Sequence, residues 1–216
     1  MGVNICIGDL VCFTSYRDAN IMKAVITYTL VFSPLVIGLT IGAIYGNKWG
    51  DAKYKNLKKP VYNPPSYVFG IVWPILYLMI GTIYSYALYD SICIPDKVSK
   101  CGTTKYFKDL KYWIIPMLAL LFNFLYIPVF FGENGLFNGF IIIIFSLVFA
   151  ILTLIQFYFQ DNYNNSIKYY AIVALVPYIA WLSFASYLSY ELYMLNKAYV
   201  TKERSNERNE VTRGTK

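Results

Sequence analysis

Five long stretches of the chain contain no charged residue. They span residues 24–47, 60–89, 112–132, 134–160 and 169–190. Each can supply the roughly 20 apolar residues that an α-helix needs to cross a bilayer. Because the backbone must satisfy its own hydrogen bonds inside lipid, apolar segments of this length are helical. The pattern predicts an all-α integral membrane protein with a five-transmembrane-helix bundle. The expected helices lie near residues 22–46, 68–89, 112–132, 136–159 and 169–195.

The composition separates this interpretation from a soluble protein. Hydrophobic residues make up 57% of the 216 residues and charged residues 14%, whereas a soluble domain is about 45–50% apolar and about 25% charged. A soluble helical bundle with an unusually apolar core is the alternative, and it does not explain charge-free runs of this length. The chain has no histidine, which excludes histidine-based triads, histidine metal ligands and histidine-ligated haem.

The charged residues divide the chain and suggest its orientation. We expect an N-terminal segment over residues 1–21, a membrane domain over 22–197 and a disordered polar tail over 198–216. With five spans, the N-terminus and the second and fourth loops share one side and carry eight basic residues, while the other side carries eleven. The positive-inside rule then favours a cytosolic C-terminus. Because the basic residues lie in separate loops, the net charge of +7 indicates topology, and we expect no nucleic-acid partner.

The first loop combines prolines with aromatic residues. Pro60, Pro64 and Pro65 fall within six residues, so this stretch cannot lie inside a helix. The aromatic residues in and beside it are Tyr54, Tyr62, Tyr67, Phe69, Trp73 and Tyr77. One interpretation is an aromatic belt at the membrane interface. The other is a lid, lined with flat rings, over a pocket between helix ends.

A second motif runs from Asn123 to Gly132 in the third predicted helix. Asn123 is an amide within the membrane, where we expect it to hydrogen-bond to a neighbouring helix. That bond serves either to hold helices together or to position a ligand. Pro128 frees a backbone carbonyl about one turn earlier and permits a kink.

A third motif runs from Pro177 to Tyr190 in the fifth predicted helix. Trp181, Ala185 and Leu188 share one face at helical spacing. Small residues beside large rings either let helices approach closely or leave room for a ligand, and the sequence leaves both uses open.

In this order, the three motifs resemble the translocator protein family, also called TspO/MBR, tryptophan-rich sensory or peripheral-type benzodiazepine receptor proteins. The family's first-loop pattern, with its Lys-Pro and Pro-Pro elements followed by Trp and Leu-Tyr, is met between Lys59 and Gly81. Its Asn-led pattern ending in Phe-Phe-Gly is met in the second motif, and its Pro-Tyr-x-Ala-Trp pattern in the third. The resemblance covers roughly residues 24–197.

The resemblance implies a pocket that opens toward the first loop. Family members bind porphyrins, sterols and synthetic isoquinoline-type ligands there and are usually dimeric. For this chain it implies a membrane receptor or transporter that binds a planar hydrophobic ligand, most naturally a porphyrin (tetrapyrrole), and that forms a homodimer in lipid. The porphyrin would be a ligand and not a cofactor, and we assign no catalytic or metal-binding residue. The implied ligand-binding residues are Tyr62, Trp73, Asn123, Tyr126, Trp181, Ala185 and Leu188.

Departures from the family pattern bear on the function. Tyr62, Tyr67, Phe124 and Tyr126 stand where the family has tryptophan. Stacking survives these exchanges, whereas chemistry that needs an indole is weakened. A light- or oxygen-dependent porphyrin-degrading enzyme is therefore the second interpretation, and a ligand-independent membrane scaffold the third. Sterol binding is doubtful, because Met194 stands where the family's sterol pattern has a cation.

Two further patterns concern association and oxidation. Glycines recur every fourth residue at 38, 42 and 46, a spacing that permits close contact either inside the bundle or at a dimer seam. The cysteines are Cys6, Cys12, Cys93 and Cys101. Five spans place all four on one side of the membrane, and on an oxidising side they can form disulfides. We favour a bridge between Cys93 and Cys101, with four free thiols as the alternative.

Overall fold

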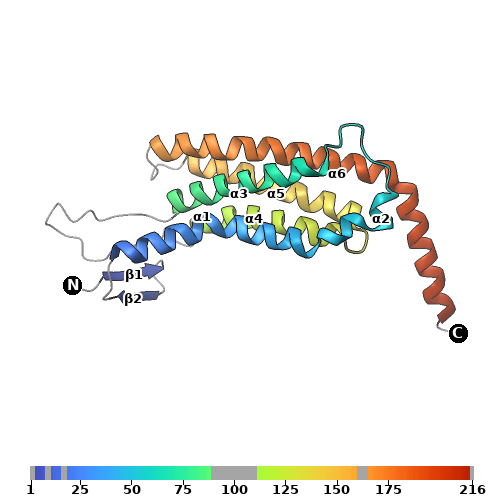
Figure 1. Ribbon diagram of the computed structural model, residues 1–216, viewed down its shortest axis with the longest axis horizontal. Coiled ribbons are helices and arrows are strands. Elements are labelled where there is room, and N and C mark those ends of the chain that lie inside the picture. The colour runs from blue at the N-terminus through green and yellow to red at the C-terminus, as the bar shows by residue number, and fades with distance from the viewer. Residues whose placement is uncertain (1–2, 8–10, 16–18, 89–110, 160–164, 215–216) are drawn as a thin grey trace.

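The structure, a computed structural model, describes residues 3–7, 11–15, 19–88, 111–159 and 165–214 (Figure 1). Within these residues, five helices are long and apolar enough to cross a membrane. They are α1 (Ala19–Ile44), α3 (Ser66–Leu88), α4 (Lys111–Phe130), α5 (Gly135–Phe159) and α6 (Asn165–Gly214). Each corresponds to one of the five charge-free stretches, so the predicted five-helix membrane fold is confirmed.

Two shorter features flank α1. Before it, β1 (Val3–Ile7) and β2 (Val11–Ser15) form an antiparallel hairpin whose backbone register places Cys6 opposite Cys12. The hydrophobic pattern did not predict this hairpin. Cys93 and Cys101, the favoured disulfide pair, lie outside the described residues. After α1, the 3₁₀ helix η1 (Gly46–Gly50) and the single turn α2 (Ala52–Lys55) lie in loop 1, which we define as residues 45–65.

The long helices pack as a closed ring. α1 packs against α3, α3 against α6, α6 against α5, α5 against α4, and α4 against α1. Loop 1 and the turn between α4 and α5 lie at the same end of this bundle (Figure 1). That end therefore holds the start of α3, the end of α4 and the stretch of α6 around Asn196.

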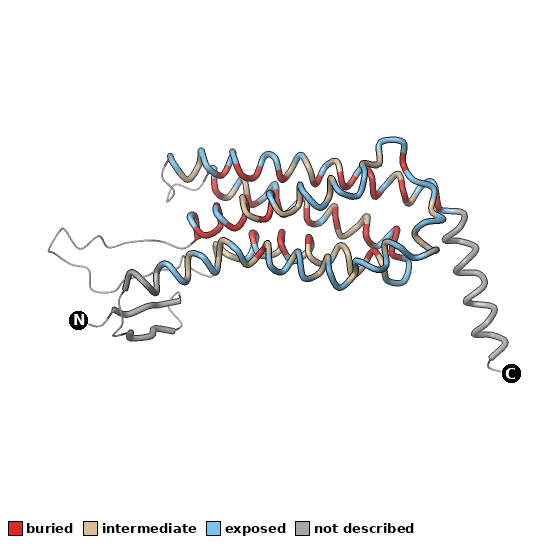
Figure 2. Tube along the Cα trace, viewed as in Figure 1, coloured by how far each residue is buried: buried red, intermediate tan, exposed pale blue. Residues whose placement is uncertain are grey.

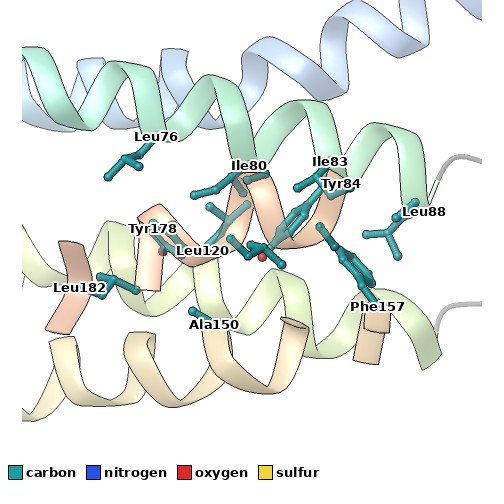
Figure 3. Close-up of a cluster of buried hydrophobic side chains, with 14 of the residues drawn as sticks. Leu76, Ile80, Ile83, Tyr84, Leu88, Leu120, Ala150, Phe157, Tyr178 and Leu182 are labelled. Atoms are coloured by element: carbon teal, nitrogen blue, oxygen red, sulfur yellow. The ribbon is translucent and has the colours of Figure 1, made fainter. Parts of the chain in front are cut away.

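Buried side chains from four helices fill the centre of the ring (Figure 3). They include Ile80 and Ile83 of α3, Leu120 of α4, Phe157 of α5 and Tyr178 of α6. The outward faces remain apolar and exposed (Figure 2), which is the arrangement expected of helices whose outer surface faces lipid. In such a setting, helices associate through close packing and interhelical hydrogen bonds.

α1 is the most peripheral helix of the bundle. Only 6% of the residues in its apolar stretch are buried, against 28% to 44% of those in the other four helices. Two glycines allow it to approach α3: a Cβ at Gly81 would overlap the carbonyl oxygen of Val31, and one at Gly38 would overlap the ring of Tyr77. Gly42, in contrast, has no neighbour within 4 Å of an added Cβ. The glycine repeat therefore makes an internal contact at Gly38 and leaves Gly42 open.

The structure differs from the sequence-based expectation beyond residue 197. We expected a disordered tail over 198–216, whereas α6 continues as a helix to Gly214 and projects beyond the bundle (Figure 1). The tail has too little apolar surface to form a core of its own, which is why its composition indicated disorder. It is, however, rich in Lys, Glu and Arg, which have high helix propensity and allow an existing helix to continue.

Candidate functional site

An aromatic cluster attaches loop 1 to the end of α4. The Trp49 ring stacks against Phe130 with the centroids 5.7 Å apart, and it meets Phe131 edge-on at 4.7 Å and Tyr54 edge-on at 4.8 Å. Burial raises the pKa of the Tyr54 phenol above its ordinary value. The first half of loop 1, up to Leu57, therefore packs against this end of the bundle.

Aromatic rings of α3 and α6 form a continuous row beneath loop 1. Trp73 stacks on Tyr77, one turn further along α3, with the centroids 5.5 Å apart. Trp73 also meets Trp181 of α6 edge-on at 6.4 Å, and Trp181 in turn contacts Phe69 at 5.7 Å and Phe184 at 5.6 Å. These separations lie in the favourable range for aromatic pairs. The row offers flat apolar surfaces in the interior of the bundle.

Asn123 connects this row to α4. The Tyr77 hydroxyl donates a hydrogen bond to Asn123 Oδ1 at 2.8 Å. Both residues are buried, with 8% of Tyr77 and 4% of Asn123 exposed. The expected cross-helix hydrogen bond of Asn123 is thereby confirmed. Its partner is a side chain of the aromatic row, so the amide lies beside that row.

Two buried donors beside the row have no protein partner. Asn123 Nδ2 and Trp181 Nε1 lack a hydrogen bond to any of the described residues. Buried polar groups are almost always paired, and an unpaired one costs about 1–3 kcal/mol. A ligand that brings acceptor atoms into this region would remove that cost.

Asn123 and the aromatic row lie in the half of the bundle nearest loop 1. Asn123 is seven residues from the end of α4, and Trp73 is seven residues from the start of α3. At a rise of 1.5 Å per residue, both lie about 10 Å below the helix ends. This depth corresponds to a site just under the cover formed by loop 1.

The other residues expected in the pocket divide into three groups. Ala185 and Leu188 are buried on α6, 8% and 7% exposed, one and two turns beyond Trp181. Tyr126 packs against both the central core and the cluster around Trp49, so it lies between the cover and the aromatic row. Tyr62 is separate from these: 70% of it is exposed on loop 1, and it is not enclosed with the other expected residues.

Sequence reasoning noticed Tyr77 as part of a motif and did not assign it to the site. The structure makes it the residue that joins Trp73 to Asn123. Its spacing of four residues from Trp73 indicates that the two rings are neighbours, because such residues are adjacent on a helix surface. Phe69 was overlooked in the same way and has the same spacing on the other side of Trp73.

Comparison with known proteins identifies the family. The model of the TspO/MBR family matches residues 30–195, most of the chain. The chain belongs to the TspO/MBR family. Together with the five apolar helices, this membership makes it a multi-pass integral membrane protein.

Several named TspO/MBR relatives are similar along much of the chain. The tryptophan-rich protein TspO of Archaeoglobus fulgidus is 28% identical over 177 residues, which cover 82% of this chain and 99% of that protein. The CrtK protein of Rhodobacter capsulatus is 25% identical over 155 residues, covering 72% and 83%. A translocator protein homolog of Schizosaccharomyces pombe is 29% identical over 102 residues, covering 47% and 56%.

Proposed function

We propose that this TspO/MBR protein is a membrane receptor or transporter that binds a planar hydrophobic ligand between α3, α4 and α6, beneath loop 1. The observation that carries the proposal is the pair of unpartnered buried donors, Asn123 Nδ2 and Trp181 Nε1, beside a row of flat rings. Flat apolar surfaces favour stacking with an aromatic ligand. The two N–H groups favour one that also carries acceptor atoms.

A metal-free porphyrin is the ligand class that fits best. It is flat and apolar, and its carboxylates can accept charge-assisted hydrogen bonds from cations at the membrane surface. Lys58 and Lys59 are exposed on loop 1 at the end of the bundle nearest the site. The absence of histidine from the chain removes the commonest axial ligand of haem iron, which favours the metal-free form.

The direct test is titration of the detergent-solubilised protein with protoporphyrin, followed through the Soret absorbance of the porphyrin. We expect saturable binding by the wild type. The Trp181→Phe variant retains an aromatic ring and loses the buried N–H, so its affinity should fall about five-fold, the effect of one hydrogen bond. Trp113→Phe is the matched control, because Trp113 lies ten residues from Asn123 on α4, about 15 Å along the helix. Absence of saturable binding by the wild type would overturn the proposal.

The exposed Tyr62 provides a separate test of the lid. If loop 1 closes on the ligand through this ring, Tyr62→Ala should weaken protoporphyrin binding while leaving thermal stability unchanged, since the side chain is 70% exposed. Binding equal to that of the wild type would remove Tyr62 from the site and leave the contribution of α3, α4 and α6 intact.

Porphyrin breakdown driven by light or oxygen is the second candidate. The edge-on pair of Trp73 and Trp181, with centroids 6.4 Å apart, favours it, because indole rings are readily oxidised. Spectra of the bound porphyrin before and after illumination distinguish the two functions: a Soret band that stays intact supports binding alone. If neither binding nor breakdown occurs, a ligand-independent scaffold becomes the better hypothesis.

A further inference from the structure

One side chain of α6 holds loop 1 by its backbone. The Lys58 N–H donates to Asn196 Oδ1 at 2.9 Å, and Asn196 Nδ2 donates to the Lys58 carbonyl oxygen, also at 2.9 Å. The same Nδ2 donates to the carbonyl oxygen of Leu192 at 2.8 Å, one turn earlier on α6. The amide thus satisfies both backbone groups of a residue 138 positions away, and its own orientation is fixed by its helix.

The contact is partly shielded from water. Asn196 is 5% exposed, and Leu57, next to Lys58, packs in the cluster around Trp49. In such surroundings water competes weakly for the bonded groups, and breaking a hydrogen bond leaves them unpaired. The pair of bonds therefore holds Lys58 firmly against α6.

Beyond Lys58 the chain continues as a short stiff segment to the start of α3 at Ser66. We call residues 59–65 the loop 1 strap. Its three prolines restrict the backbone, and a turn within it is closed by a hydrogen bond from the Asn63 N–H to the Pro60 carbonyl oxygen at 3.1 Å. The middle of the strap is not packed against the bundle, because Val61 is 94% and Tyr62 70% exposed.

These features give the strap two attachments and an open middle. One attachment is α3, which the strap enters directly. The other is the end next to Lys58, where Asn196 holds the Lys58 backbone, Pro60 is buried and the Lys59 ammonium lies 5.1 Å from the centroid of the Tyr54 ring. These contacts are non-covalent and can open. A stiff segment held in this way moves as a unit when its releasable end opens, since its prolines prevent local folding.

We propose that Asn196 is a positioning residue that holds the loop 1 strap over the bundle end and so sets the rate of ligand access to the site beneath it. The inference rests on the proposed function. Asn196 lies 15 residues beyond Trp181 on α6, about 22 Å along the helix, so it acts through the strap without touching the ligand. Its loss lowers the barrier to both binding and release.

The first arm of the test needs no ligand. Hydrogen exchange of the peptide that contains Lys58 is compared between the wild type and Asn196→Leu, which removes the donor and the acceptor while keeping a similar volume. We expect exchange at Lys58 to become about ten-fold faster or more, because its amide loses a protected partner. Asn138→Leu is the matched control: Asn138 lies at the same end of the bundle, and its Nδ2 donates to the Glu133 carbonyl oxygen in an exposed setting. Unchanged exchange at Lys58 in Asn196→Leu would overturn the proposal.

The second arm measures rates of protoporphyrin binding by stopped flow. We expect the association and dissociation rate constants of Asn196→Leu to rise together, each about five-fold for the loss of a hydrogen bond, so that Kd changes little. General damage to the bundle would instead raise dissociation alone and weaken Kd, and that result would overturn the gating role. If the wild type does not bind protoporphyrin, the proposed function fails, while the exchange data still decide whether Asn196 holds the strap.

A second variant, at the residue that Asn196 binds, tests the proposal if Asn196→Leu fails to fold. Lys58→Pro removes the N–H that donates to Asn196 and leaves α6 unchanged. It should accelerate exchange in the peptide that follows, over residues 61–67; exchange is the measurement for this variant, because Lys58 is also a proposed cation for the porphyrin carboxylates. Wild-type exchange of this peptide in Lys58→Pro would overturn the proposal. Asn196→Gln, which retains a donor and an acceptor, should return part of the way to wild-type rates.

Discussion

Asn123 shows how a single buried amide can serve two purposes. Its oxygen accepts a hydrogen bond from the Tyr77 hydroxyl, and its nitrogen has no partner among the described residues. The first contact ties α3 to α4 in a lipid environment, where such bonds contribute modestly to stability. The second leaves a donor available to a ligand. Stability and binding can therefore be separated by substituting the two partners of the hydrogen bond.

A double-mutant cycle measures the structural share of this contact. Tyr77→Phe removes the donor, Asn123→Leu removes the acceptor, and the pair of substitutions removes both. We expect a coupling energy of about 0.6 to 1.7 kcal/mol, the range of hydrogen bonds between membrane helices. Unfolding in detergent measures it. A coupling near zero would mean that the bond does not stabilise the protein, and that the amide is retained for its free donor.

At the scale of the helices, the approach of α1 to α3 depends on the absence of side chains at two positions. Gly38 accommodates the Tyr77 ring, and Gly81 accommodates the backbone of α1 at Val31. The first contact also supports the site, since Tyr77 is the residue that joins Trp73 to Asn123. The position of a peripheral helix is in this way connected to the geometry of the aromatic row.

Replacing Gly81 with alanine should lower the thermal stability of the protein. The added methyl group would overlap the Val31 carbonyl oxygen, so α1 must move away, at a cost of about 1–3 kcal/mol for overpacking. Gly42→Ala is the control: it adds the same group where no atom lies within 4 Å, and alanine is the better helix former. Thermal unfolding in one detergent compares them. Equal melting temperatures for the two variants would show that α1 can move away from α3 without loss of stability.

At the scale of the whole molecule, the bundle has two different ends. Loop 1, the turn between α4 and α5, and the extension of α6 lie at one end, and the N-terminal hairpin lies at the other (Figure 1). The larger number of basic residues falls on the loop 1 side. We therefore propose that the access route beneath the loop 1 strap faces the cytosol.

A protease confined to the cytosol tests this orientation. A tag placed after Lys216 is expected to be digested, and a tag placed before Met1 to survive until the membrane is dissolved. The opposite pattern would place loop 1 on the non-cytosolic side. It would also move the four cysteines, which five spans put on the N-terminal side, into the reducing compartment.

A homodimer is the second proposal at this scale. Gly42 lies one turn beyond Gly38 on α1, and an added Cβ there meets nothing within 4 Å. Small residues at such positions allow two membrane helices to approach closely. We expect Gly42→Leu to reduce the mass of a dimer to that of a monomer in detergent-corrected light scattering. A dimer mass that is unchanged would remove this face of α1 from the interface.

Much of this protein is determined by the sequence alone, because the signals are local. A charge-free run of about 20 residues is helical in lipid regardless of its neighbours, so the five helices followed from the pattern. Asn123, Trp73 and Trp181 stood out because an amide within an apolar run, or aromatic residues at fixed spacing, can be seen in the sequence itself. Helix propensity is also local, and in the tail it favours the continuation of α6 over the disorder that the polar composition predicts.

The tertiary structure decided which of these residues meet. Packing, and not spacing, determines that Gly38 contacts Tyr77 while an added Cβ at Gly42 meets nothing within 4 Å, and that Tyr62 is exposed while Trp73 and Trp181 touch. The contact between Asn196 and Lys58 joins residues 138 positions apart. In the sequence, Asn196 is an ordinary polar residue near a helix end. Its role depends on how loop 1 returns to α6, and that is set by the closure of the whole bundle, which no local pattern encodes.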